Sequence, residues 1–591
     1  MSLRLASMRC MIRPMPVTQD VAAGNEPETM CRSSEPLVTP FDDLFSYPVT
    51  EWDDPDTINI DIATPQEIVR QIFNNESQLF PPKSQKGLLA RSVVDACAAA
   101  ADLLRSMLTS RAAVMPRIVL VGAGTSGRLC YFIASLLREE FKGRAKLVPL
   151  IAGSAKSLTR GQTGAEDDAA AGVRDFRRHV PSSARRQTLV LGVSCGLSSA
   201  YVAAVLAESL KGGASGGVLI GFAADRDATV DIKSLLPSRH LILVNPDIGP
   251  EPISGSVRMK GGTATIIILH AILMDALRGR RQSKSRIRES IETRRRALTG
   301  LRTYEPQMGH LIDLAGTALR AGGNLHLLAQ GALARLCVYD VAECFTTFGA
   351  SREQVAAYSA RGCADLAYYR DDAVRLKSRV RSFRSFHRRF RADRDRAFTL
   401  TDTLSAESLT SRVVARSDPS ITNLVFGPER ASGPRAVDGS SITWFELPST
   451  EALDTYLFAR VVLVHVSTGA FIRYGRVLRN RMIGLRITSR KLMRRGIRLL
   501  SEYAQLSPEA SVALLRQVVK GRGGQTTQRK SDLIRQASHI DHIIPRALLL
   551  SLYPDLSGDE VDHLFRDEPV LRRLVLRLIA AERVSGQLSR T

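Results

Sequence analysis

Two short loops that combine glycine with hydroxyl side chains have the composition needed to hold a phosphate monoester. The first loop, residues 122–127, has the spacing Gly-x-Gly-x-x-Gly and contains Gly124, Thr125 and Ser126. The spacing also fits a dinucleotide site, which requires an acid about 20 residues further on. Here the next apolar run ends in residues 150–154, Leu-Ile-Ala-Gly-Ser, without a carboxylate. Hydroxyls beside exposed backbone N–H groups at a helix start favour a phosphate.

A second loop repeats this chemistry after another apolar run. Residues 194–198 read Ser-Cys-Gly-Leu-Ser and place Ser194, Cys195, Gly196 and Ser198 directly before an apolar helix. Either loop alone could be a serine-capped helix after a glycine turn. Two such loops at neighbouring strand ends favour a shared anion. Three or four charge-assisted hydrogen bonds of about 1.5–3 kcal/mol each, less ordering costs, support micromolar binding.

Short aliphatic runs position these loops. They occupy residues 118–121, 147–151, 188–193, 217–221 and 240–244 and alternate with helical stretches at the spacing of βα units. This pattern predicts an α/β domain with a doubly wound parallel sheet. The ligand is expected at the carboxyl ends of the strands, where both loops lie.

The chain contains a second, weaker copy of this domain. A shift of 207 residues superposes identical residues of the two halves: Gly124 on Gly331, Arg128 on Arg335, Leu129 on Leu336 and Cys130 on Cys337. The same shift places Ser126 on Leu333, so the second copy lacks the hydroxyl loop. One half is therefore expected to bind the ligand and the other to complete the wall of the site.

These patterns together predict two tandem doubly wound parallel-sheet domains followed by an all-helical domain. From about residue 467 the sequence is helical, with start signals at Ser507-Pro-Glu and at Ser557-Gly-Asp-Glu. We assign the chain to four parts: an acidic, proline-containing arm and first helix at 1–85, the first α/β domain at 86–290, the second at 291–465 and the helical domain at 466–591.

The net charge raises the question of a polyanionic partner. The 591 residues include 82 Lys and Arg against 59 Asp and Glu, a net charge of +23. The excess lies mostly in residues 278–302, 377–396 and 473–498, where apolar residues such as Leu478 and Met482 recur at helical spacing. We therefore expect the arginines to form solvated helix faces. Together with an acidic segment at residues 14–61, this argues against nucleic acid as a partner.

Cysteine spacing and hydropathy bound the remaining classes. The eight cysteines form no Cys-x-x-Cys pair, so we expect neither a disulfide framework nor a zinc site, no metal and no cofactor. The longest apolar stretch, residues 264–277, is interrupted by His270 and Asp275 and predicts a buried helix without membrane association. A cytoplasmic or nuclear location is expected. The basic first thirteen residues leave an organelle open.

Both loops resemble the sugar-isomerase (SIS) domain, a phosphosugar-binding module. Residues 249–264, Gly-Pro-Glu-Pro-Ile-Ser-Gly-Ser-Val-Arg-Met-Lys-Gly-Gly-Thr-Ala, resemble the signature of the family that contains glucokinase regulatory protein and bacterial N-acetylmuramic acid 6-phosphate etherase. Val257 and Ile266 depart from the usual family residues. The resemblance covers about residues 48 to 580. Its signature residues here are Glu251, Ser254, Ser256, Arg258 and Lys260.

The resemblance directs attention to two glutamates and one lysine. One etherase glutamate matches Glu166, whereas the other falls on Leu136, which cannot transfer a proton. The 207-residue shift carries position 136 to Glu343, within Asp-Val-Ala-Glu-Cys. Glu343 could cross the pseudo-twofold axis and hold sugar hydroxyls in the first pocket, or it could be a surface glutamate on a degenerate copy. The resemblance also implies that Lys491 in the helical domain reaches the sugar phosphate.

The resemblance implies a binding protein that holds fructose 6-phosphate or fructose 1-phosphate and inhibits or regulates a glucokinase or hexokinase in a ligand-dependent way. Such a protein would be a non-catalytic monomer, because the internal repeat replaces a dimer. The enzymatic alternative is an etherase, a carbon–oxygen lyase acting on N-acetylmuramic acid 6-phosphate with Glu166 and Glu343 as the acid–base pair. An SIS-type DNA-binding regulator would need a helix-turn-helix head, and the acidic segment argues against one.

Overall fold

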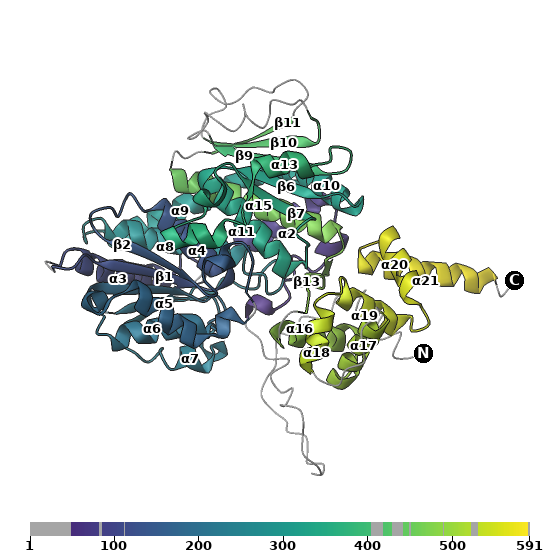
Figure 1. Ribbon diagram of the computed structural model, residues 1–591, viewed down its shortest axis with the longest axis horizontal. Coiled ribbons are helices and arrows are strands. Elements are labelled where there is room, and N and C mark those ends of the chain that lie inside the picture. The colour runs from purple at the N-terminus through teal and green to yellow at the C-terminus, as the bar shows by residue number, and fades with distance from the viewer. Residues whose placement is uncertain are drawn as a thin grey trace, which may run out of the picture. The chain divides into compact units, whose positions relative to one another are not determined.

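The computed structural model describes residues 49–81, 86–110, 113–162, 164–214, 216–402, 418–427, 441–447, 451–487, 490–521 and 530–588. The chain divides into two compact units, one spanning Pro48–Met482 and the other containing everything from Ile483 onward (Figure 1). The predicted acidic arm lies outside the described residues as far as residue 48.

The first unit begins with a five-stranded parallel sheet that carries both loops. Its strands are β1 (Arg117–Gly122), β2 (Lys146–Ile151), β3 (Thr188–Val193), β4 (Gly217–Ile220) and β5 (Leu241–Val244). Their order is β2-β1-β3-β4-β5. The strand β2 lies on one side of β1, and the later strands lie on its other side, so the order of strand addition reverses between β1 and β3. This confirms the predicted doubly wound sheet, with each predicted strand within two residues of its place. The two loops follow β1 and β3, the strands at the topological switch point.

Alternating side chains of these strands pack against helices on both faces of the sheet. In β1, Ile118 and Leu120 belong to one apolar core, whereas Val119 and Val121 belong to another. The helices of this half are α3 (Arg91–Leu108), α4 (Gly124–Leu136), α5 (Ala169–His179), α6 (Ala200–Lys211), α7 (Val230–Lys233), α8 (Lys260–Ala276) and α9 (Ser283–Gly300). The predicted buried helix is α8, which is buried along almost its whole length.

The second half repeats this topology. Its strands are β6 (Leu325–Ala329), β7 (Val355–Ser359), β8 (Arg381–Ser382), β9 (Arg396–Asp402), β10 (Ile421–Gly427) and β11 (Ser441–Glu446), in the order β11-β10-β9-β6-β7-β8. Without the short edge strand β8, the order β7-β6-β9-β10-β11 matches that of the first sheet, strand for strand. All of these strands pair in parallel. The internal repeat predicted from the 207-residue shift is thus a duplicated fold.

Helices of the second half come from three parts of the sequence. They are α10 (Glu305–Arg320), α11 (Gly331–Thr347), α12 (Arg370–Leu376), α13 (Phe383–Arg389), α15 (Ala452–Arg473) and, from before the first domain, α2 (Pro65–Ser77). Because α2 packs on α10 and α15, it does not extend from the protein with the predicted arm. Its start is fixed by a capping box between Thr64 and Glu67.

The predicted boundary of the helical domain at residue 466 falls inside a helix of the first unit. The helix α15 packs against α10 and α11, and the boundary between the units lies after Met482. By length and composition α15 could span a membrane, but 94% of its apolar window is buried inside the protein. It is longer than residues 264–277, which the sequence reading took as the longest apolar stretch.

The arginines between residues 473 and 498 do not all lie on solvated helix faces as predicted. Leu478 and Met482 belong to a short antiparallel hairpin of β12 (Val477–Leu478) and β13 (Arg481–Met482), not to a helix. In this hairpin Arg476, Arg479 and Arg481 are buried. Arg481 bonds Asp53 at 2.6 Å, so its charge is compensated. In α9 the prediction holds for Arg288, which is exposed between the buried Ile287 and Ile291, but not for Arg294, which is buried.

The second unit is helical throughout its described residues. It contains α16 (Arg490–Ala504), α17 (Pro508–Lys520), α18 (Lys530–Ala537), α19 (Ile543–Leu552), α20 (Gly558–Asp567) and α21 (Leu571–Leu588). Both predicted start signals are confirmed. Ser507 caps α17 with Pro508 at its first position, and Ser557 and Glu560 form a capping box at α20.

Candidate functional site

The glycines of the first loop have two different roles. A Cβ atom on Gly122 would lie 2.6 Å from the backbone nitrogen of Gly127, and one on Gly127 would lie 2.5 Å from Cγ1 of Ile151. These two glycines therefore allow the tight turn from β1 into α4 and the close packing of α4 on β2. Gly124 is different, because it is exposed, has a φ of +52° and would place a Cβ in open space. The approach to the start of α4 is open at Gly124.

The second loop meets the first at the adjacent strand end. Oγ of Ser126 lies 3.4 Å from Sγ of Cys195, and both side chains are buried. Burial raises the pKa of Cys195 to about 11, so the thiol stays protonated and packs the two loops together without acting as a nucleophile. Gly196 is half-buried and Ser198 is exposed, so this loop also reaches the surface.

Ser194 has a structural role that the sequence reading did not predict. Its Oγ accepts hydrogen bonds from the backbone N–H groups of Ser198 at 3.0 Å and Ser199 at 3.2 Å. The left-handed conformation of Leu197, with a φ of +48°, folds the loop back over this hydroxyl. The Ser194 hydroxyl therefore shapes the loop, and its own O–H can still donate to an anion.

Because Ser194 satisfies two backbone donors, Ser194→Ala is expected to lower the free energy of unfolding by about 1–2 kcal/mol. Urea denaturation of the full chain measures the change. Ser198→Ala is the matched control, since Ser198 is an exposed serine of the same loop and its replacement is expected to stay within about 0.5 kcal/mol of wild type. Equal stability of the two variants would contradict the structural role.

Glu343 reaches the first loop from the other α/β domain. It lies on α11, and its Oε1 accepts a hydrogen bond from Oγ1 of Thr125 at 2.6 Å. The same oxygen pairs with the guanidinium of Arg128, whose side chain is 2% exposed. Of the two readings of Glu343, the structure supports the one in which the residue crosses between the domains. Its predicted contact with sugar hydroxyls remains a prediction.

Arg128 is a residue of this site that the sequence reading used only to align the repeat. It lies one turn into α4, and its Nε also donates to the carbonyl of Leu158 at 3.4 Å. The copied position, Arg335, is also largely buried, and burial lowers its pKa. Nothing in the sequence around an arginine that follows a glycine loop indicates that the arginine will be buried and paired with a distant carboxylate.

The space behind the contact between Thr125 and Glu343 is too small for a sugar. It is a cavity of about 30 Å³ that Arg128, Arg258 and Tyr339 help to line, which is room for about one water molecule. A sugar at these loops would therefore have to bind on their open side, where Gly124 and Ser198 are exposed.

Glu166 lies beside the second loop. It belongs to a short 3-10 helix, Ala165–Asp167, and its carbonyl accepts a hydrogen bond from Oγ of Ser199 at 3.2 Å. Its side chain is half-buried. The structure thus fastens Glu166 to one loop and Glu343 to the other.

The signature residues form the framework of the site. The buried carboxylate of Glu251 accepts the backbone N–H groups of Lys260 at 3.0 Å and Gly261 at 2.8 Å, which caps α8. Burial raises the pKa of Glu251 to about 7 and lowers that of Lys260 to about 8. Ser254 donates to the carbonyl of Glu51 at 2.6 Å. The hydroxyl of Ser256 is buried without a hydrogen-bond partner among the described residues.

Arg258 links this framework to the second α/β domain. Its guanidinium pairs with Asp340 on α11 at 3.0 Å and donates to Ser467 at 3.2 Å and Thr468 at 2.5 Å on α15. Asp340 and Glu343 are three residues apart and share a face of α11. The signature arginine therefore sets the rotation of the helix that carries Glu343.

Two predictions concern features outside this arrangement. Lys491 lies in the first turn of α16 in the second unit, and its side chain lies outside the described residues. For metals, the described part of the chain contains no group of three or more His, Cys, Asp or Glu side chains that could hold an ion.

Comparison with protein families gives two matches, one in the first α/β domain and one in the C-terminal part of the chain. Residues 100–210 match the model of the glucokinase regulatory protein N-terminal SIS domain. Residues 479–575 match the model of the C-terminal lid domain of glucokinase regulatory protein. The second match begins at residue 479 and so includes four residues before the boundary between the two units, which lies after Met482.

Curated relatives extend the similarity over most of the chain. Glucokinase regulatory protein of Rattus norvegicus is 27% identical over 561 residues, which is 85% of this chain and 88% of the relative. The protein from Homo sapiens is 25% identical, over 86% of this chain and 89% of its own length. N-acetylmuramic acid 6-phosphate etherase of Deinococcus radiodurans is 32% identical over 38% of this chain and 66% of its own length.

Solved structures with some similarity include two proteins that act on sugar phosphates. The C-terminal domain of glucosamine-fructose-6-phosphate aminotransferase from Francisella tularensis has a TM-score of 0.41 and 11% identity over 70% of this chain and 96% of that domain. Tagatose-6-phosphate ketose/aldose isomerase from Escherichia coli has a TM-score of 0.40 and 13% identity over 69% of this chain and 93% of its own.

Proposed function

Since the chain resembles the glucokinase regulatory proteins along 85% of its length, we propose that it binds a fructose phosphate and regulates a glucokinase or hexokinase in a ligand-dependent way. The observation that carries the proposal is the contact of Glu343 with Thr125, because it joins the second domain to the loop of the first. A ligand at that loop would touch both domains. A binding protein whose ligand bridges two domains can report occupancy to a partner.

We propose that the chain has one phosphosugar site, in the first α/β domain. The copied loop has Gly331 with a φ of +57°, like Gly124, but Ala332 and Leu333 replace the hydroxyl residues Thr125 and Ser126. Leu333 is 1% exposed and belongs to the apolar core. The second domain thus keeps the turn and lacks the phosphate ligands, and the tandem repeat supports a monomer with one ligand.

A non-catalytic role is also part of the proposal. Position 136, where the etherases have a glutamate, is a leucine, and Glu343 already accepts from Thr125 and pairs with Arg128. Both partners engage the same carboxylate oxygen, Oε1 of Glu343. Incubating the full chain with N-acetylmuramic acid 6-phosphate and assaying lactate tests this. Sustained lactate release would overturn the regulatory proposal in favour of the etherase.

A thermal-shift screen identifies the sugar. The full chain is incubated with fructose 1-phosphate, fructose 6-phosphate, sorbitol 6-phosphate and N-acetylmuramic acid 6-phosphate. A ligand at 100 times its dissociation constant stabilises the folded state by about 2.7 kcal/mol. The sugar with the largest shift is then tested for its effect on the inhibition of glucokinase by this protein. Absence of inhibition with and without that sugar would contradict the regulatory function while leaving the sugar site intact.

Ser126→Ala is expected to weaken binding of the preferred fructose phosphate by about 1.5–3 kcal/mol, because it removes a hydroxyl donor beside the start of α4. Its partner in the structure is the neutral thiol of Cys195, so stability should change by less than about 1 kcal/mol. Isothermal titration calorimetry measures the affinity. Ser199→Ala is a matched control in the neighbouring loop, since the Ser199 hydroxyl bonds only backbone atoms among the described residues. Unchanged affinity of Ser126→Ala would remove the phosphate assignment of the first loop.

A further inference from the structure

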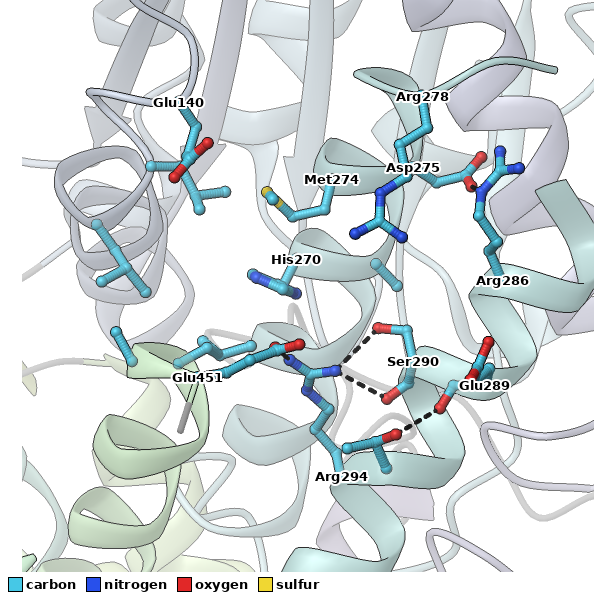
Figure 2. A pocket seen from close by; sticks show the side chains of 16 residues that line it. Glu140, His270, Met274, Asp275, Arg278, Arg286, Glu289, Ser290, Arg294 and Glu451 are labelled. Carbon is cyan, nitrogen blue, oxygen red and sulfur yellow. Dashed lines mark hydrogen bonds and ion pairs between the residues drawn. The ribbon is translucent and has the colours of Figure 1, made fainter. Parts of the chain in front are cut away.

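A second pocket lies at the opposite end of α4 from the phosphate loop. Its volume is about 390 Å³, within the range of small-molecule sites (Figure 2). The end of α4, the second half of α8, the first half of α9 and the start of α15 form its walls. Since Leu136 follows Thr125 by 11 residues and Ser126 by 10 on α4, about 16 Å of helix separates this pocket from those two residues.

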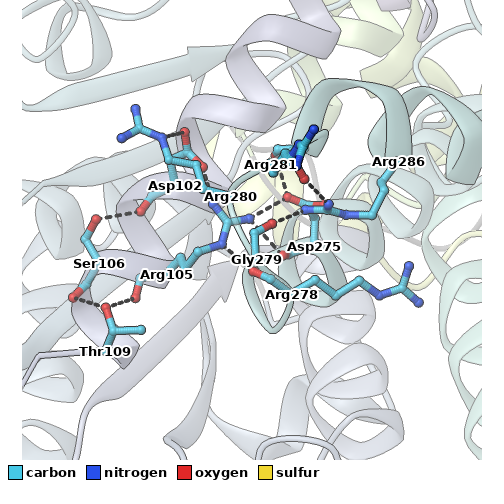
Figure 3. Close-up of polar contacts among 11 residues, drawn as sticks. Asp102, Arg105, Ser106, Thr109, Asp275, Arg278, Gly279, Arg280, Arg281 and Arg286 are labelled. Carbon is cyan, nitrogen blue, oxygen red and sulfur yellow. Dashed lines mark hydrogen bonds and ion pairs between the residues drawn. The ribbon is translucent and has the colours of Figure 1, made fainter.

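Two arginines that line this pocket form ion pairs with carboxylates, which hold their side chains in place. Arg286 pairs with Asp275 at 2.7 Å, and Asp275 is held from its other side by Arg105 at 2.7 Å (Figure 3). Arg294 is buried and pairs with Asp454 at 3.0 Å and with Glu451. These ion pairs connect α3, α8, α9 and α15, so the helices around the pocket are held to one another.

The third arginine, Arg278, differs from the other two. Its guanidinium points towards the middle of the pocket (Figure 2), and it forms no hydrogen bond or ion pair with any residue that the structure describes. Its main chain is held, because its carbonyl accepts a hydrogen bond from Nε of Arg105 at 2.5 Å. Arg278 is exposed, and its side chain extends from a main chain that is held in place.

His270 adds a neutral polar group to the pocket wall. It is 8% exposed, and its Nδ1 is buried without a hydrogen-bond partner among the described residues. Burial and the charges of Arg294 and Arg278 lower its pKa to about 3, so the ring is neutral at physiological pH. A neutral imidazole can donate one hydrogen bond and accept another.

The rest of the lining selects the kind of anion. Five of the lining residues are apolar: Leu136, Leu137, Ala271, Met274 and Leu453. Glu140 and Glu289 are exposed acids at the lining and would repel a multiply charged ligand. One unpartnered cation, an apolar wall and two nearby acids suit an anion of single charge with an apolar body.

We propose that this pocket binds a small organic monocarboxylate, whose carboxylate pairs with Arg278 and whose apolar body packs against Met274 and Leu136. The site is separate from the phosphosugar site and does not depend on the proposed function. Arg278 supplies the charge-assisted hydrogen bonds, and His270 supplies a neutral hydrogen bond to a carboxylate oxygen or a ligand hydroxyl.

The test uses benzoate as the probe and the full chain as the protein, with affinity measured by ligand-observed NMR titration. Wild type is expected to bind benzoate and to bind benzamide, its neutral analogue, at least 10-fold more weakly. Arg278→Gln is expected to weaken benzoate binding by about 10-fold or more. Arg280→Gln is the matched control, because Arg280 is two residues away, 82% exposed and paired with Asp102 outside the pocket lining.

A pocket-filling variant provides a second readout. Thr293→Trp places an indole at the pocket lining on α9 and is expected to abolish benzoate binding, while urea denaturation checks that the variant is folded. Absence of benzoate binding to wild type would overturn the proposal. So would equal affinities of Arg278→Gln and Arg280→Gln, or inorganic phosphate binding more tightly than benzoate.

Discussion

Replacing Asp340 by asparagine is expected to lower the free energy of unfolding by about 3–5 kcal/mol, because it leaves the charge of Arg258 buried without a counter-ion. Both side chains are 2% exposed, and the two charged groups are 3.0 Å apart. The guanidinium cannot lose its proton to relieve the cost. Its other side-chain partners, the hydroxyls of Ser467 and Thr468 and the thiol of Cys344, are neutral and cannot replace the carboxylate.

Urea denaturation of the full chain, followed by circular dichroism, measures this change. Asp371→Asn is the matched control, since Asp371 pairs with Arg178 at 2.7 Å but the two side chains are 65% and 55% exposed. An exposed pair contributes about 0–1 kcal/mol. The double variant Arg258→Met with Asp340→Leu removes both charges and is expected to recover most of the lost stability. A loss in Asp340→Asn no larger than in the control would show that Arg258 does not depend on this carboxylate.

The ion pair matters for the site because it acts on the helix that carries Glu343. Arg258 comes from the signature segment of the first domain, and Asp340 lies one turn before Glu343 on α11. Holding Asp340 therefore holds Glu343 towards Thr125. The position of the signature segment thus explains how a framework residue can affect ligand binding without touching ligand.

The strands and the repeat could be predicted from the sequence because both are periodic signals. Each strand of the first sheet is a short aliphatic run followed by a helix, so its existence and place follow from local composition. The 207-residue shift then located α11 and brought Glu343 into consideration, and the equal strand order of the two sheets shows why the shift works. The two halves of a duplicated fold stay aligned in sequence even where one half has lost the residues that would bind a ligand.

The buried arginines could not be predicted, because their partners are distant in sequence. Arg258 meets Asp340, and Arg128 meets Glu343, across more than 80 residues in each case. In the hairpin that contains Arg479 and Arg481, an apolar spacing of four residues imitates a helix, although the segment is too short for one. Local spacing cannot distinguish an arginine on a solvated face from one that is buried beside a carboxylate.

The same limit explains why the role of Ser194 in shaping its loop could not be predicted. A serine after a strand and before a helix can point its hydroxyl at a ligand or at the helix start. The outcome depends on the fold of the following residues, here the left-handed Leu197, which turns two backbone N–H groups towards Oγ. The sequence therefore located the loop after β3, but it could not show that the Ser194 hydroxyl accepts two backbone N–H groups.

Replacing Glu343 by glutamine is expected to affect stability and ligand binding together. The side chain of Glu343 is 13% exposed and that of Arg128 is 2% exposed, so the variant leaves a buried arginine without its carboxylate. By the argument used for Asp340, the free energy of unfolding should fall by about 3–5 kcal/mol. Binding of fructose 6-phosphate should weaken by about 1.5–3 kcal/mol, because a charged acceptor for the sugar hydroxyls is lost and Thr125 loses its partner.

The two effects of Glu343→Gln separate the roles that this residue could have. Calorimetric titration well below the unfolding temperature gives the affinity of the folded protein, and urea denaturation gives its stability. Glu353→Gln, an exposed glutamate of the same domain, is the control and should change neither quantity. Lower stability with unchanged affinity would mean that Glu343 is only the counter-ion of Arg128, which would contradict its role in ligand binding.

If wild type released lactate from N-acetylmuramic acid 6-phosphate and the variant bound this ester but did not cleave it, Glu343 would be a catalytic group and the etherase reading would replace the regulatory one. Joint loss of stability and sugar affinity, without lactate release by wild type, is the pattern that a ligand-bridged pair of SIS domains requires.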